Sequence, residues 1–478
     1  MDQVSATQNP ASSLRITEHP LQRCGAWAVA VLAGCERAEQ VTAEQFDVVI
    51  QRIIGDVVEA AIAHQGSGAY DWWKVLFALY PNSKPTHAKR EKDRTVLGRE
   101  MAWLFSPDEA ERSWRACTFC GQASGVLWAK STLPMFDSIR ALNTLPPGTA
   151  GWPVCRGCRV ALWALPYGAW LTAGSATVLI CANPQVERQF VARNVRRAGR
   201  IRQLGFDGLP AMAGPEAVTL QALYEHAGDA PAATSLWMFK NDNQEPWLRV
   251  SETRTGVAQF VHRILADPDC AKGWQDLRLI LKRSNRQGRA AADGATAAAR
   301  LLFDREGERS DRLPMELWAR SGDGEKVSRH TLVRWRALCR LYAEVMYGMD
   351  ADRLKPVAEL LASWIAQESH RGRFNEYCRA AGSGYQLQRL LMKTNASLRL
   401  RGVPQEAISS ATLTDLFANG SKGWLDRALL FFEVSARLDE KRVPIGARKY
   451  DDDEEAEAEA EGEIGFDKTN VDEVEEYS

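Results

Sequence analysis

Two short cysteine motifs, Cys117-Thr-Phe-Cys120 and Cys155-Arg-Gly-Cys158, decide how this chain folds. In each motif two thiols stand three positions apart, so that a tight turn points both sulfurs at one ion, about 2.3 Å from a tetrahedral Zn²⁺. Four thiolates leave no coordination position open for water or substrate. The motifs therefore predict a structural zinc site whose binding energy contributes to folding, and the functional centre is expected elsewhere.

Buried thiols and disulfides are the alternative uses of these cysteines, because cysteine is among the most buried residue types. Two pairs at metal-ligand spacing favour zinc. The pairs are separated by 34 residues, more than the roughly 15 to 20 of an ordinary zinc ribbon. We therefore expect an inserted arm that carries Leu127, Trp128, Phe136 and Asn143. Six further cysteines stand singly, which suits a reducing cytoplasm better than a secreted disulfide scaffold.

Length and composition describe an ordinary globular protein. The chain has 478 residues, of which 45% are hydrophobic and 25% charged, enough for two to four domains with sizeable cores. It contains no run of 18 apolar residues, and residues 1–13 are polar. A membrane span and a signal peptide are therefore not expected, and the sequence predicts a cytoplasmic protein.

The net charge of −1 conceals a strong division along the chain. Residues 451–478 hold 14 of the 61 acidic residues and one of the 60 basic residues, which leaves residues 1–450 with a net charge of +12. A basic body fits a polyanionic partner such as nucleic acid. The acidic tail is expected to be disordered, and it either keeps the protein soluble or competes with nucleic acid for the basic body.

The hydrophobic patterns predict an α+β fold that is mostly α. Helices are expected over 23–32, over 43–61 with a capping box from Thr42 to Gln45, over 72–80, over 186–204 and almost continuously from 331, and strands over 177–181, 236–239 and 247–250. The resulting division is a flexible leader (1–13), an N-terminal helical region with a basic loop (14–105), a zinc-binding segment with the four paired cysteines (106–170), an α/β region with an arginine-rich helix (171–270), a basic linker and helix (271–328), a C-terminal helical bundle (329–440) and an acidic tail (441–478).

Two basic segments are candidate nucleic-acid contacts. The first is a loop after the aromatic helix, with Asn82, Lys84, Lys89 and Arg90, where charge and stacking favour phosphates and bases. The second is helix 186–204, in which Arg193, Arg196, Arg197 and Arg200 stand at spacing i, i+3, i+4 and i+7 and so share one face. For both segments the alternative is an ordinary solvated surface.

Known catalytic patterns are missing from the sequence. There is no phosphate loop, no His-Glu-x-x-His, no zinc-deaminase signature and no nucleophile elbow, and the seven histidines show no ligand spacing. A binding or scaffold protein is therefore favoured over an enzyme.

The order of these parts resembles the CXXC-CXXC large subunits of type I CRISPR surveillance complexes, those of type I-B and close relatives. The family begins with a strand and turn of the form Thr-Gly-Asn-Pro-Phe-x-Asp-x-Gly, which residues 17–25 resemble, although Glu18, Leu21 and Arg23 depart from it. Four further features resemble the family: Tyr80-Pro81-Asn82-Ser83, the paired cysteine motifs with Asn143 between them, Leu165-Pro166-x-Gly168, and Phe239-x-Asn241-x-Asn243-Gln244-x-Pro246.

The resemblance implies a non-catalytic subunit that recognises the short motif flanking a target (the PAM) in double-stranded DNA and helps R-loop formation. Its partners would be CRISPR RNA, the backbone and small subunits of the Cascade complex, and a helicase-nuclease or transposition proteins recruited later. Guide pairing reads the target sequence in such effectors, while protein reads the flanking motif and the backbone. The C-terminal bundle could also be made as a separate small subunit from Met315, Met346 or Met349.

On this interpretation Lys84, Lys89, Arg90 and the four arginines of helix 186–204 contact phosphates, and Asn82 contacts a base edge. Two alternatives stay open. One is a zinc-ribbon nucleic-acid-binding accessory protein outside CRISPR systems, and the other is a metal-dependent nuclease whose carboxylates are dispersed along the chain.

Overall fold

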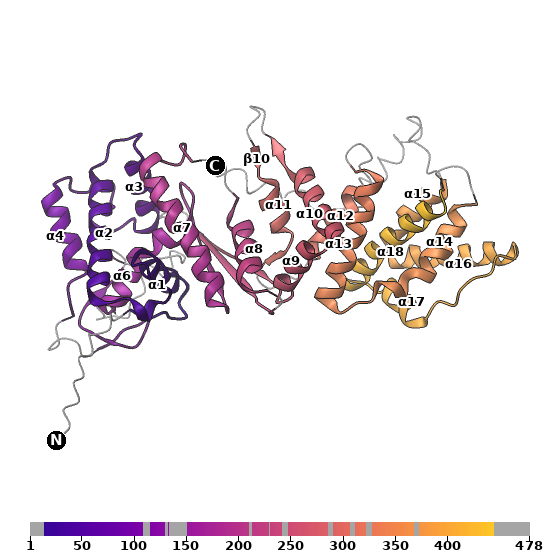
Figure 1. Ribbon diagram of the computed structural model, residues 1–478, viewed down its shortest axis with the longest axis horizontal. Coiled ribbons are helices and arrows are strands. Elements are labelled where there is room, and N and C mark those ends of the chain that lie inside the picture. The colour runs from indigo at the N-terminus through magenta and orange to yellow at the C-terminus, as the bar shows by residue number, and fades with distance from the viewer. Residues whose placement is uncertain are drawn as a thin grey trace, which may run out of the picture. The chain divides into compact units, whose positions relative to one another are not determined.

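The computed structural model describes residues 14–108, 115–129, 132, 151–209, 213–228, 230–240, 247–284, 290–305, 311–321, 327–367 and 372–443. Within them the fold is α+β and mostly helical, as predicted (Figure 1). The chain forms two compact units, Met1–Leu313 and Pro314–Ser478. The leader, most of the arm between the cysteine motifs, the hairpin turn 241–246 and the acidic tail lie outside the described residues.

Four helices open the first unit: α1 (Pro20–Leu32), α2 (Ala43–Ile62), α3 (Gly68–Leu79) and α4 (Arg94–Leu104), with a short 3₁₀ helix η1 (Ala38–Gln40). The capping box predicted from Thr42 to Gln45 begins α2. The Asp93 side chain accepts hydrogen bonds from the first amides of α4. Because Asp93 starts this helix, the basic loop ends before Arg94.

The cysteine motifs lie in two small antiparallel ladders, β1 (Arg115–Ala116) with β2 (Ala123–Ser124), and β3 (Leu127–Trp128) with β4 (Trp152–Pro153). Helix α6 (Arg156–Gly168) follows directly and is buried from Gly157 onward. It crosses α1 so closely that a Cβ at Gly25 would overlap the carbonyl of Ala161. The metal segment is thus joined to the main core of the unit.

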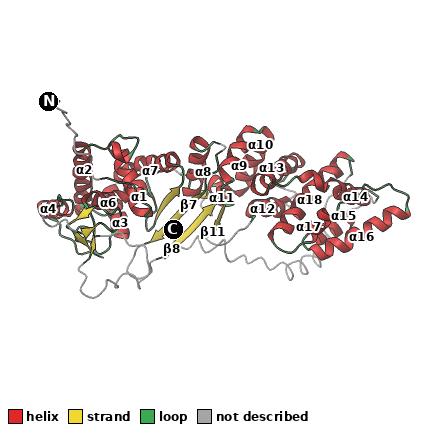
Figure 2. Ribbon diagram, turned by 90° about the horizontal axis from the view of Figure 1, so that it is seen from below, coloured by secondary structure: helices red, strands yellow, loops and turns green. Residues whose placement is uncertain are grey.

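A five-stranded antiparallel sheet follows, in the order β11-β8-β7-β6-β5. The predicted hairpin is present, with Lys240 opposite Trp247. Helices α7 and α8 lie on one side of the sheet (Figure 2). The bounds are β5 Trp170–Leu171, β6 Ala176–Cys181, α7 Pro184–Leu204, α8 Pro215–His226, β7 Thr234–Lys240, β8 Trp247–Thr253 and β11 Phe303–Arg305.

Between β8 and β11 the chain forms two helices that the sequence patterns did not predict, α9 (Val257–Ala266) and α10 (Pro268–Leu281). Asp267 caps α10, and Pro268 stands at its first position. The range 271–328, expected to be a linker and a helix, therefore starts inside a helix. It continues through β9 (Arg283–Ser284), β10 (Ala290–Ala292) and α11 (Gly294–Arg300).

The second unit is the predicted helical bundle, but it begins at Pro314 rather than at residue 329. Trp318 of α12 contacts Trp424 and Phe431, which explains why this helix belongs to the bundle. Its elements are α12 Arg312–Ser321, α13 Arg329–Tyr347, η3 Ala351–Leu354, α14 Lys355–Ile365, α15 Gly372–Ala381, α16 Gly384–Leu400, α17 Ser410–Phe417 and α18 Ser421–Glu440. In the described part of the chain, no helix combines the length and apolarity needed to cross a membrane.

Candidate metal centre and basic surfaces

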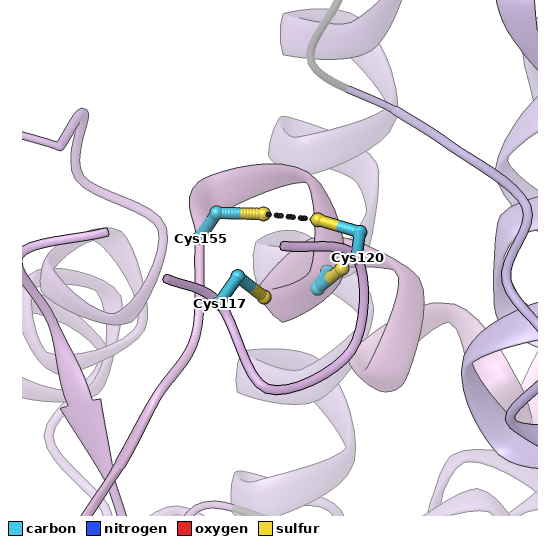
Figure 3. A group of neighbouring side chains, drawn as sticks. Cys117, Cys120 and Cys155 are labelled. Atoms are coloured by element: carbon cyan, nitrogen blue, oxygen red, sulfur yellow. Dashed lines mark hydrogen bonds between the residues drawn. The ribbon is translucent and has the colours of Figure 1, made fainter. Parts of the chain in front are cut away.

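The four cysteines of the two motifs come together as predicted. The sulfurs of Cys117, Cys120, Cys155 and Cys158 all lie within 4.8 Å of one another. Figure 3 shows three of these side chains pointing toward a common centre, with the Cys120 and Cys155 sulfurs 3.4 Å apart. Three of the four residues are buried, and Cys120 is half-buried. Four sulfurs at this spacing provide a closed, soft donor set that suits Zn²⁺.

Local backbone geometry explains how each pair is presented. The Gly121 amide donates to the Cys117 carbonyl at 2.9 Å, and Gly121 has a φ of 74°. This left-handed conformation favours glycine and turns the chain back after the first pair. In the second pair, Cys155 is the N-cap of α6 and Cys158 lies in its first turn. The positive end of that helix favours thiolate over thiol.

The clustered thiols shift one another's pKa values in opposite directions. Hydrogen bonding from Cys120 and the other two thiols lowers the pKa of Cys117. The pKa of Cys158 is raised, chiefly because its thiol donates to Cys117. A bound divalent cation would replace these shared protons and hold all four groups as thiolates.

Both cysteine motifs contact residues at the start of α1. The side-chain amide of Gln22 donates to the Cys158 sulfur at 3.7 Å and to the Arg15 carbonyl at 2.6 Å, while its oxygen accepts from Thr17. The ring of His19 meets that of Phe119 edge-on, with centroids 4.9 Å apart. Gln22 therefore has the position of an outer-shell partner that orients a ligand.

A buried arginine of α6 follows directly after Cys158. Arg159 is 0% exposed and donates to the carbonyls of Leu104 and Ser106 and to the Asp108 carboxylate, at 2.8 to 2.9 Å. It ties the end of α4 to α6. Arg159 was not predicted from the sequence, because only its distant partners distinguish it from a surface arginine.

The predicted basic loop is partly exposed and partly structural. Lys84 and Lys89 are exposed, and the Lys84 ammonium lies 3.2 Å from Glu100. Asn82 is half-buried. Arg90 instead donates to the Ala61 carbonyl at 2.6 Å and stacks on Trp73 at 3.8 Å. These internal contacts favour a structural role for Arg90 over the expected phosphate contact.

The four arginines of α7 also differ in exposure and contacts. Arg196 and Arg200 are exposed and Arg193 is half-buried. Arg197 lies over the Trp170 ring at 4.2 Å and donates to the Leu171 carbonyl at 2.6 Å, and burial lowers its pKa to about 10. The face predicted from spacing therefore offers three guanidinium groups to a partner, and the fourth secures α7 to β5.

Arg23, one of the residues that depart from the family's first-turn pattern, donates to a buried carboxylate. Glu187 of α7 accepts from the Arg23 guanidinium at 2.7 and 2.9 Å, from Trp27 at 2.9 Å and from the Cys181 amide at 2.9 Å. Arg23 therefore links α1 to α7. No sequence pattern indicates this pair, because its members are 164 positions apart.

Comparisons with protein-family models, with curated proteins and with solved structures found no match to this chain.

Proposed function

We propose that this chain is the large subunit of an RNA-guided surveillance complex of type I, which recognises the motif flanking the target in double-stranded DNA and helps to open the duplex. It catalyses no reaction itself. Its partners are CRISPR RNA, the other subunits of the complex, and the helicase-nuclease or transposition proteins that act afterwards, all in the cytoplasm.

The observation that carries this proposal is the convergence of three family-like segments that are far apart in the sequence. Residues 17–25 contact the cysteine motifs through His19 and Gln22. Tyr80, at the start of the Tyr-Pro-Asn-Ser stretch, stacks on Trp163 of α6 at 4.3 Å and donates to the Leu162 carbonyl at 2.6 Å. Segments that form one contiguous region support a shared role better than scattered motifs would.

The charges of the same unit support a nucleic-acid partner. Lys84 and Lys89 project from the loop that follows Tyr80, and Arg193, Arg196 and Arg200 from α7. Such groups neutralise phosphates and release counterions, independently of sequence. In this proposal Asn82 contacts a base edge, and Zn²⁺ held by the four cysteines braces the region.

Co-purification with the products of the neighbouring genes tests the proposal. We expect a stoichiometric short RNA in the purified complex, and preferential binding of duplexes carrying one flanking motif when a randomised library is selected. Lys84→Glu with Lys89→Glu should weaken binding equally for all sequences, whereas Asn82→Ala should relax the motif preference. Lys272→Glu, an exposed change on α10, is the control.

Two results would replace the proposal. Zinc-dependent binding with neither RNA nor motif preference would favour an accessory protein outside CRISPR systems. Cleavage of nucleic acid that depends on exchangeable Mg²⁺ or Mn²⁺ would favour a nuclease.

A further inference from the structure

A cavity of about 570 Å³ lies among α7, α8, α9, α10 and α11, away from the cysteine cluster. Small-molecule and cofactor sites in proteins typically measure roughly 300–1,000 Å³. Its walls combine charged, aromatic and aliphatic side chains from five helices of the first unit. This mixture is typical of a site that holds an amphipathic ligand rather than an ordinary packing defect.

Positive charge exceeds negative charge in this cavity. Arg193 and Arg196 enter from α7 and Arg278 from α10, against one carboxylate, Glu225. The Glu225 oxygens accept from Gln221 at 2.7 Å and from Gln189 at 2.9 Å, and these bonds together with the charges of His226 and Arg193 lower its pKa. Within the described residues Arg196 and Arg278 form no ion pair, so two guanidinium groups are available to an anionic ligand.

The rest of the lining offers flat and apolar surface next to these charges. Tyr224 is 37% exposed and Trp274 is half-buried, and Val261, Ile264 and Leu265 complete this side. Trp274 and Arg278 stand four positions apart on α10, which places them on one helix face. An aromatic ring beside a guanidinium group is the pairing that binds a base together with its phosphate.

The walls are fixed by contacts that do not use the cavity groups. Arg300 of α11 donates to Glu216 of α8 at 3.0 Å, and the Gly214 amide donates to Thr296 at 2.6 Å. A Cβ at Gly294 would overlap the Arg278 carbonyl, so α11 starts directly against α10. A cavity held in this way needs little ordering when a ligand binds.

We propose that this cavity binds a nucleoside phosphate, with the phosphate at Arg196 and Arg278 and the base against Trp274 and Tyr224. The inference rests on the proposed function and adds to it a place for one unpaired nucleotide of a single strand. A free nucleotide carries the same chemistry, and the two sources are distinguished by experiment.

The test measures binding of a fluorescent 12-nucleotide dT oligonucleotide to the full-length chain, with dTMP and inorganic phosphate as separate competitors. Arg196→Ala and Arg278→Ala should each raise Kd about ten-fold, and the double variant should reduce the slope of log Kd against log salt by about 1.4, or 0.7 per lost contact. Trp274→Ala should weaken binding about ten-fold and leave that slope unchanged. Lys272→Ala is the control, because Lys272 is an exposed cation of α10 outside the cavity lining.

If dTMP displaces the oligonucleotide and inorganic phosphate does not, the ligand is a free nucleotide. If the oligonucleotide binds and dTMP does not displace it, the ligand is a single strand. The inference is overturned if neither the oligonucleotide nor dTMP binds, if phosphate competes as well as dTMP, or if Lys272→Ala weakens binding as much as Arg196→Ala. Circular dichroism and melting temperatures identify variants that fail to fold, and Arg196→Lys then repeats the test. If the cavity variants bind the oligonucleotide normally and also co-purify with guide RNA, this inference is refuted and the proposed function stands. Normal cavity binding without any guide RNA would refute only the proposed function.

Discussion

Arg197 and Arg200 stand three positions apart on α7, yet their guanidinium groups meet different surroundings. Arg197 stacks on Trp170 and donates to the Leu171 carbonyl, whereas Arg200 is exposed and has no ion pair within the described residues. A charge held by a ring and a carbonyl stabilises the fold through both contacts, and an exposed charge contributes little.

We therefore expect Arg197→Ala to lower the free energy of unfolding by about 2 kcal/mol, through the lost hydrogen bond and cation–π contact. Arg200→Ala should change it by less than about 0.5 kcal/mol. Urea denaturation of both variants measures the difference. Equal stability of the two variants would contradict a structural role for Arg197.

The contrast also shows what the sequence could predict at this scale. Each cysteine pair could be predicted, because two thiols three positions apart converge by local geometry. The meeting of the two pairs was predicted because four thiolates complete one tetrahedral site. The four arginines do lie in one helix, as their spacing indicated. That spacing could not separate Arg197 from Arg200, because Trp170 and Leu171 come from another element, and only the tertiary fold brings them to α7.

At the scale of elements, α1 and α6 cross without space for a side chain between them. Gly25 faces the Ala161 carbonyl, and Gly168 faces Cys24. This crossing joins the start of α1, which carries Gln22, to the helix that carries Cys158. Its geometry therefore fixes the distance between the metal ligand and its hydrogen-bond partner.

Gly25→Ala should destabilise the first unit by about 3 kcal/mol, because the added Cβ must displace backbone rather than a flexible side chain. Gly55→Ala is the control, since Gly55 is exposed in α2 with open space around its Cβ position. It should stabilise the protein by about 0.5–1 kcal/mol. Thermal unfolding followed by circular dichroism measures both changes, and a neutral Gly25→Ala would show that the helices can separate.

The bundle of the second unit depends on a buried carboxylate in α18. Glu433 is 0% exposed and accepts from Arg336 at 2.6 and 2.9 Å and from Arg340 at 2.8 Å, both on α13. Glu433→Gln should cost about 3 kcal/mol, because it leaves Arg336 without its counter-charge and Arg340 with Asp352 alone. Glu440→Gln changes an exposed carboxylate of the same helix and should cost less than about 0.5 kcal/mol. Chemical denaturation measures both, and equal costs would refute the importance of the buried network.

Sequence patterns predicted many of the elements with strong periodicity, but not all of them. The hairpin of β7 and β8 and the long helices of the bundle follow from alternating or helical spacing of apolar residues. Helices α9 and α10 were missed although Asp267 and Pro268 supply a good helix start. The buried residues Val257, Phe260, Val261 and Ile264 of α9 do recur at helical spacing, so the signal for this helix was present in the sequence and was overlooked. In α10 only four residues are buried, and the apolar pattern is weaker.

At the scale of the whole molecule, the four clustered cysteines all belong to one of two compact units. Binding of a structural zinc contributes roughly 10–16 kcal/mol in zinc-finger peptides, as much as the entire stability of a typical domain. Loss of the metal should therefore affect the first unit far more than the bundle.

Calorimetry with and without a zinc chelator at neutral pH tests this expectation. We expect one zinc per chain by elemental analysis, and a chelator-induced loss of the unfolding transition of the first unit while the transition of the bundle remains. Cys155→Ser should reproduce the effect of the chelator. Cys378→Ser, a change of a half-buried thiol in the second unit, should retain the metal. A full zinc content in Cys155→Ser would contradict the assignment of this ligand.

The charge division of the chain supports a final expectation. Without residues 451–478 the net charge changes from −1 to +12. If the acidic segment competes for the basic surface, its deletion should tighten nucleic-acid binding roughly three- to ten-fold at low salt. The gain should vanish near about 0.3 M salt, where screening shortens the range of these charges. Fluorescence anisotropy on duplex DNA measures the effect. A chain with the same number of tail residues, but glutamine in place of each acid, separates charge from length. If this neutral-tail variant and the unaltered chain bind DNA with equal affinity, the acidic segment does not compete with nucleic acid, and only a role in solubility is left for it.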